Sequence, residues 1–188
     1  MARKETITID KITDTAFEMA REEGLMGVTA RKVAAKAECS TQPIFRVYKN
    51  MEELWSAVYI RSVDYFRGFY DLYDKTSDVP FANLGMAYIS FAKKEKHLFE
   101  ILFVSENSFL SKDAKKSMYE ILNGKNGNVV VEINAAKTKG CADPSDLFMK
   151  LWILIHGAAC MCLTGDYDLS DEETLLLLQK SYEAFSKS

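Results

Sequence analysis

Proline is scarce in this chain. Only 3 of its 188 residues are proline, at positions 43, 80 and 144. Apolar residues recur every three or four positions rather than every second one, which is the period of an amphipathic helix. Few helix breakers and this period together predict an all-α protein of about nine helices and argue against a sheet.

Histidine and cysteine are also few, and their spacing matches none of the common metal-binding motifs. The chain has 2 histidines and 4 cysteines and contains no C-x-x-C, E-x-x-H or H-x-x-x-H pattern. These absences exclude the common zinc motifs and a disulfide framework, so neither a metal nor another cofactor is expected. Thiols without disulfide spacing fit a reducing cytoplasm.

Hydrophobic runs long enough for targeting or membrane insertion are missing too. The first ten residues are charged and have no apolar stretch typical of a secretion signal. The longest apolar run, 147–163, is short for a bilayer span and carries Lys150 and His156. It is therefore predicted to be a buried helix, and no membrane association is expected.

Excess positive charge is absent from the whole chain but present in one short segment. The net charge is −3, whereas residues 28–50 hold five basic side chains and one acidic side chain, a local charge of +4. Local cations that neutralise phosphates are what binding to a DNA backbone requires. A solvated helix face that happens to be basic would give the same count.

Helix-capping residues and breaks divide the chain into segments. Thr29 and Ser40 are placed as N-caps of two short helices, and Asn50 with Glu53 has the offset of a capping box. The same signals predict helices over the following ranges: 8–23, 29–37, 40–47, 50–73, 80–94, 96–105, 111–123, 129–138, 144–163 and 171–186.

The segment 12–54 resembles the DNA-binding domain of TetR-family transcriptional regulators. The resemblance rests on an ordered set of residues: Gly24-Leu25, Val28-Thr29, Val33-Ala34, Ala37, Ser40, Ile44-Phe45, Tyr48, Asn50 and Glu53-Leu54. Three positions depart from the family pattern, since Glu38 replaces a glycine, Phe45 a tyrosine and Met51 a lysine. Glu38 would need the left-handed backbone that only glycine adopts cheaply, or a different turn.

The resemblance implies a helix-turn-helix DNA-binding domain over 1–53, joined through the fourth helix to an effector-binding and dimerisation domain over 54–188. Thr41 and Gln42, at the start of the second motif helix, would address base edges in the major groove. The residues expected at the DNA are Thr29, Arg31, Ser40, Thr41, Gln42, Pro43, Phe45, Arg46, Tyr48 and Lys49.

Two further sets of residues follow from the same resemblance and from helical spacing. Aromatic and sulfur-bearing side chains of the second domain are candidates for effector binding, although core packing uses the same residue types: Phe91, Phe99, Phe103, Met118, Trp152 and His156. Two helical stripes are candidates for a dimer interface, although a core-facing stripe has the same spacing: Leu151, Ile155, Ala158, Cys162, Leu175, Leu178, Tyr182 and Phe185.

The function implied is that of a ligand-responsive, homodimeric regulator of the bacterial cytoplasm, a repressor that binds a palindromic operator in double-stranded DNA and an unknown small-molecule effector. A helical adaptor that has lost DNA binding is the alternative. An enzyme is not expected, because His156 and Cys160 stand one helical turn apart in apolar surroundings without a nearby orienting carboxylate.

Overall fold

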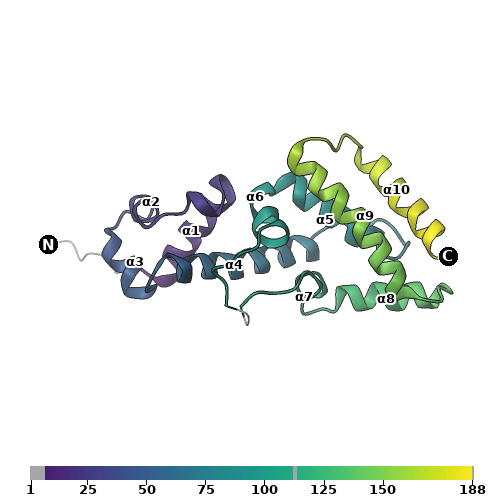
Figure 1. The fold of residues 1–188 in the computed structure, drawn as a ribbon, viewed down its shortest axis with the longest axis horizontal. Helices are drawn as coiled ribbons and strands as arrows, with labels where there is room; N and C mark the ends of the chain where they lie inside the picture. The colour runs from purple at the N-terminus through teal and green to yellow at the C-terminus, as the bar shows by residue number, and fades with distance from the viewer. Residues whose placement is uncertain (1–6, 112–113, 188) are drawn as a thin grey trace. The chain divides into compact units, whose positions relative to one another are not determined.

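The structure, a computed structural model, describes residues 7–111 and 114–187, and these residues form helices and no strand. This confirms the predicted all-α class. The helices, in chain order, are α1 (Ile9–Glu23), the 3-10 turn η1 (Leu25–Gly27), α2 (Ala30–Lys36), α3 (Thr41–Val47), α4 (Met51–Asp71), α5 (Ala82–Lys94), α6 (Lys96–Phe99), the π-helical turn η2 (Glu100–Val104), α7 (Met118–Asn123), α8 (Asn128–Thr138), α9 (Pro144–Thr164) and α10 (Asp171–Phe185) (Figure 1).

Contacts divide the chain into two compact units. The first comprises the described residues up to Tyr65 together with His97–Lys116, and the second comprises Phe66–Lys96 and the described residues from Ser117 onward. The division falls within α4, whose residues belong to both units. Whether the ranges 1–53 and 54–188 act as separate functional domains stays a prediction.

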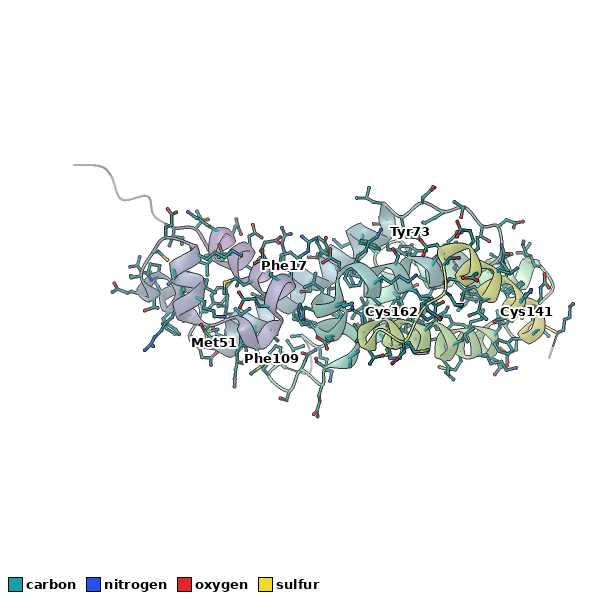
Figure 2. The ribbon with its side chains drawn as sticks, turned by 90° about the horizontal axis from the view of Figure 1, so that it is seen from above. Phe17, Met51, Tyr73, Phe109, Cys141 and Cys162 are labelled. Carbon is teal, nitrogen blue, oxygen red and sulfur yellow. The ribbon has the colours of Figure 1, made fainter. Side chains whose placement is uncertain are left out.

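The first unit is built on α1, whose apolar face is buried. Thr8 caps α1 by accepting from the backbone N–H of Lys11, and Ile12, Ala16 and Ala20 are fully buried along one side. Phe17 of α1 is labelled in Figure 2. Its ring lies 5.4 Å from that of Tyr65. Helix α2 packs on α1, and α3 packs on α2, so this pair of short helices is supported by its neighbours in the fold.

The second unit has α5 and α9 as its central pair, with α10 packed on both. Its core lies where these helices meet, and a glycine permits the close approach. A Cβ at Gly85 of α5 would lie 2.9 Å from a methyl carbon of Ile155 on α9 and 2.9 Å from one of Leu178 on α10. These three helices therefore interlock at a point that leaves no room for a side chain.

Helix α9 is long and apolar enough to cross a membrane by length and composition, and 44% of its most apolar stretch is buried inside the protein. Core helices of water-soluble proteins pass the same test. Its N-cap is Asp143, which accepts from the backbone N–H groups of Ser145 and Asp146, and Pro144 occupies the first turn. The apolar run 147–163, predicted to form a buried helix, thus packs one face against α5 and α10.

Two predicted helix boundaries are wrong. The helix expected over 111–123 includes residues 112 and 113, which lie outside the described residues. Its described part begins at Met118, because Ser117 forms a capping box with Glu120 that starts the helix there. The helix expected from Pro80 begins at Ala82, because Phe81 has a left-handed backbone with φ 65°. The Phe81 N–H donates to the Glu132 carboxylate at 2.6 Å, and burial raises the pKa of Glu132.

The close packing at Gly85 predicts that two glycine-to-alanine substitutions change the free energy of unfolding in opposite directions. Gly68→Ala, in an open position of α4, should raise the free energy of unfolding by about 0.5–1 kcal/mol through helix propensity. Gly85→Ala should instead lower it by about 1 kcal/mol, since overpacking costs roughly 1–3 kcal/mol. Urea denaturation of both variants measures this, and equal gains would contradict the packing described.

Candidate nucleic-acid interface

A tight turn connects α2 to α3. Thr29 caps α2 by accepting from the Lys32 backbone N–H, although at 3.4 Å the bond is long. Ser40 stands at the N-cap of α3 but makes no capping bond with its side chain. Between them Glu38 has φ 55°, the left-handed conformation expected at this position. Glutamate thus occupies the strained backbone that glycine would adopt without cost.

Helix α3 has one face on the core and leaves another to solvent. Ile44 is buried, whereas Gln42 and Arg46 are exposed and the Phe45 side chain is 48% exposed. Pro43 lies in the first turn of the helix, where no intrahelical partner for an N–H is lost. The exposed face therefore offers an amide, an aromatic ring and a guanidinium in one short helix.

Part of the basic segment is neutralised within the protein. Lys32 donates to Glu23 at 2.6 Å and Lys36 donates to Glu22 at 2.8 Å, which ties α2 to the end of α1. The hydrogen bond from Lys32 holds the pKa of Glu23 below its usual value. The local charge of +4 therefore overstates the positive charge available to a phosphate.

The remaining cations are more accessible. Arg31 and Arg46 make no ion pair within the described residues, and the Lys49 side chain is 88% exposed, 3.8 Å from Glu53. These three side chains, together with Thr29, Ser40, Thr41, Gln42, Pro43 and Phe45, lie on α2, α3 and the residues flanking them. The structure thus brings the predicted set together in the first unit.

Three side chains position the motif through contacts that the sequence did not single out. Tyr48, predicted at the DNA, has its hydroxyl 2.6 Å from the Thr13 hydroxyl of α1. The Trp55 indole N–H donates to the Val28 carbonyl at 3.1 Å, so α4 is tied to the residue before α2. Tyr48 in this structure therefore anchors the end of α3, and its ring is half-buried.

The start of α4 confirms the predicted capping signal with one change of partner. The Asn50 side chain accepts from the Glu53 backbone N–H at 2.9 Å, as a capping box requires. The Glu53 carboxylate, however, accepts from the N–H of Lys49 rather than from that of Asn50. This arrangement links the last residues after α3 to the first turn of α4.

The six candidate effector residues are divided between the two units. Phe99 and Phe103 belong to the first unit, where their rings lie 5.2 Å apart. Phe91 is buried among aromatic rings of the second unit, 5.0 Å from that of Phe66, and Met118 begins α7. A cavity of about 610 Å³ lies in the first unit, at the start of α4, and none of the six lines it.

Trp152 and His156 of that set are in contact on α9. Their rings stack 5.8 Å apart, and the Tyr88 hydroxyl lies 2.9 Å from Nδ1 of His156. Burial raises the pKa of Tyr88 and lowers that of His156, so both groups are neutral at neutral pH. These three residues form a polar cluster between α5 and α9.

The stripes predicted for a dimer interface are largely buried within a single chain, and their place in an interface stays a prediction. Six of the eight residues are buried within the second unit because they face α5 and each other: Leu151, Ile155, Ala158, Cys162, Leu178 and Tyr182. Leu175 and Phe185 are half-buried. The outward face of α9 carries Met149, Ile153 and Met161, which are 52%, 67% and 45% exposed, respectively.

Comparison with solved structures identifies the fold. The chain superposes on a protein from Vibrio parahaemolyticus assigned to the TetR family of transcriptional regulators, with a TM-score of 0.67 and 20% sequence identity over 94% of this chain and 97% of that one. A TetR-like transcriptional regulator from Rhodococcus sp. RHA1 gives 0.64 and 15%, covering 95% of each chain. A TetR-family structure from Rhodococcus sp. gives 0.63 and 16%, covering 94% of this chain and 97% of that one.

These likenesses show that the chain has the fold of TetR-family regulators, as the sequence resemblance predicted. No family model matches the sequence, and no curated protein matches it. At identities of 20% and below, the superposition concerns the fold; the function is argued below from the residues of this chain.

The strained turn leads to a stability prediction. Glu38→Gly should raise the free energy of unfolding by about 1 kcal/mol, because a non-glycine residue pays roughly 1–2 kcal/mol in the left-handed region. Glu38→Ala removes the same side-chain atoms beyond Cβ but keeps the strain, and it should give no such gain. Thermal and urea denaturation of both variants compare the two effects; similar stability for both would mean that the turn is unstrained.

Proposed function

We propose that this protein is a DNA-binding transcriptional regulator that reads double-stranded DNA with α3. The observation that carries the proposal is the outward face of α3, where Gln42, Phe45 and Arg46 are exposed while Ile44 anchors the helix. A glutamine amide can bond two atoms of an adenine edge, and a guanidinium can pair with a phosphate or a guanine. The likeness in fold to solved TetR-family structures supports this proposal.

We further propose that the protein acts as a homodimer on a palindromic operator, as a repressor. A helix of seven residues offers few base contacts, so a second copy bound about one helical turn along the DNA would double the number read. The exposed apolar residues Met149, Ile153 and Met161 on α9, with Leu176 (49% exposed) on α10, supply a surface for the second copy. In this proposal they form the interface.

A small-molecule effector and a place in the bacterial cytoplasm complete the proposal by resemblance to TetR-family regulators. The effector would act by binding better to one of two arrangements of the dimer, because only a difference in affinity shifts an equilibrium between states. Trp152 and His156, which contact each other, remain candidates for this role. The proposal includes no catalytic step.

A helical adaptor without DNA binding is the second candidate. The ion pairs of Lys32 and Lys36 with glutamates favour it, because they reduce the charge that would attract phosphates. Selection of bound duplexes from a random pool separates the two functions. An enriched palindrome supports the regulator, whereas recovery of no preferred sequence supports the adaptor.

Base reading by α3 predicts that two substitutions weaken DNA binding in different ways. Gln42→Ala should cost about 1–3 kcal/mol on the selected duplex and relax the preference at one position of each half-site. Lys49→Ala should weaken all duplexes alike and lower the salt slope by about 1. Lys32→Ala is the control. Because Lys32 is already paired with Glu23, this substitution should change the salt slope less.

Titration of matched and mismatched duplexes at several salt concentrations measures these effects. Equal losses for Gln42→Ala on both duplexes would show that this side chain does not read bases, and that specificity depends on DNA shape.

The proposed interface predicts that Ile153→Glu yields a folded monomer. Ile153 is 67% exposed in the single chain, so a carboxylate there is solvated in the monomer and buried only in the dimer. Leu178→Glu should instead unfold the second unit, because Leu178 is 3% exposed. Leu72→Glu, at an 89% exposed position, should change neither property.

Sedimentation and circular dichroism separate the three results. A dimer that survives Ile153→Glu with its fold intact would place the interface elsewhere on the protein.

A further inference from the structure

A histidine and a cysteine on α9 lie where the core meets the exposed face. His156 and Cys160 are one helical turn apart, and the Cys160 Sγ lies 3.6 Å from the His156 Nε2. Both side chains are partly exposed. Since successive helical residues are about 100° apart, Cys160 shares its face with Met149 and Ile153, which are themselves exposed.

The imidazole is held in one orientation from its inner side. The Tyr88 hydroxyl lies 2.9 Å from Nδ1, and the Trp152 ring stacks on the imidazole at an interplanar angle of 22°. When Nδ1 carries the proton and donates it to the Tyr88 oxygen, the lone pair of Nε2 points to the side of Cys160. A histidine whose second nitrogen is bonded in this way is the usual form of a metal ligand.

The distance between the two donor atoms matches a metal chelate. Zinc is bound by histidine nitrogen at about 2.0–2.1 Å and by cysteine sulfur at about 2.3 Å, in tetrahedral geometry. Those bond lengths at a tetrahedral angle separate the nitrogen and the sulfur by about 3.5 Å. The 3.6 Å separation in the protein would therefore hardly change on binding.

Within the described part of the chain, a single copy supplies two donors at this place. Among the described residues, no group of three or more histidine, cysteine, aspartate or glutamate side chains could hold a metal ion. The site is therefore incomplete without a second source of ligands. In a two-fold symmetric dimer, residues near the axis meet their own copies, so a second copy supplies the same histidine and cysteine.

The outward face of α9 allows such an approach. A Cβ at Gly157, which lies between the two donors in sequence, would meet no described atom within 4 Å beyond its chain neighbours and the backbone of its own helix. A glycine at an exposed helix position lets another backbone come close, and the apolar side chains Ile153 and Met161 on either side would be covered by that contact. The two donors are then close to the surface where the copies meet.

We propose that His156 and Cys160 of two copies bind one Zn²⁺ ion in a Cys₂His₂ site across the two-fold axis of the dimer. The inference rests on the dimer proposed above, formed through the exposed face of α9. Binding replaces the two thiol protons, which pass to the buffer, and forms two Zn–S and two Zn–N bonds with no change of oxidation state. The metal thus couples the association of two copies to metal availability.

The first experiment titrates the metal-free, full-length protein with Co²⁺, whose tetrahedral complexes have visible bands and whose thiolate bonds give a near-ultraviolet charge-transfer band. We expect one ion per dimer with two thiolate ligands, displaced by Zn²⁺. Cys160→Ser and His156→Gln should each weaken binding by roughly 100-fold or more, the upper range found even for outer-shell changes. Cys39→Ser and His97→Gln are matched controls, because they remove a thiol and an imidazole in the first unit, and they should bind as the unchanged protein does.

Tyr88→Phe tests the positioning role of the hydroxyl. It keeps the buried ring and removes only the oxygen that orients His156, so affinity for Co²⁺ should fall by about 10- to 100-fold while the bands keep their positions. Circular dichroism of each variant establishes that the fold is retained. Unchanged affinity in Cys160→Ser overturns the proposal, as does a spectrum without a thiolate band.

The oligomeric state distinguishes failure of this inference from failure of the proposed dimer. Sedimentation of the metal-free protein is measured alongside the titration, and binding to the selected duplex is measured separately. A dimer that binds DNA but no Co²⁺ overturns the metal site and leaves the proposed function in place. A monomer with and without metal overturns both the site and the dimer.

Discussion

The close approach of α5, α9 and α10 at Gly85 is the constraint on which much of the second unit depends. Ile155 and Leu178 occupy the space where a side chain at Gly85 of α5 would lie, so the close packing at this point helps to set the rotation of α9 and α10 about their axes. That rotation turns Leu151, Ile155 and Ala158 inward. It equally determines which residues of α9 face outward, and hence which surface can meet a second copy.

The orientation of α9 has a chemical consequence as well. His156 lies at the edge of the buried face, so its ring contacts Tyr88 and Trp152 on one side and Cys160 on the other. A cluster that begins in the core therefore ends at the exposed side of the helix. Packing that stabilises one chain also orients a donor pair toward the face through which two chains would associate.

In the first unit, local turns matter more than burial alone. The left-handed backbone of Glu38 reverses the chain between α2 and α3, and Trp55 and Tyr48 tie the pair to α4 and α1. Each contact restricts the direction in which α3 presents Gln42 and Arg46. A seven-residue helix is too short to be stable alone, so its rigidity must come from these neighbours.

Local signals were sufficient to predict the fold class, most helix boundaries and the helix pair near residue 40. Thr8, Asn50 and Ser170 act within one helical turn, so their effect can be read from neighbouring residues. The helix over 129–138 was likewise predicted correctly, since the structure places α8 at Asn128–Thr138. The local signals gave the wrong start for the helices expected from Ser111 and from Pro80. The first of these helices begins later, after the N-cap Ser117, and the second begins after Phe81, whose backbone is left-handed.

Only the tertiary structure decided which faces are buried and which residues meet. An apolar stripe such as Leu151, Ile155 and Ala158 has the same spacing whether it packs inside one chain or between two. The reason is that periodicity shows which face of a helix is apolar but not which element packs against that face. In the same way, the charges of Lys32 and Lys36 can be counted in the sequence, but their glutamate partners come from another helix. The sequence by itself thus determined the helices and their amphipathic faces, whereas long-range packing decided the partner of each face.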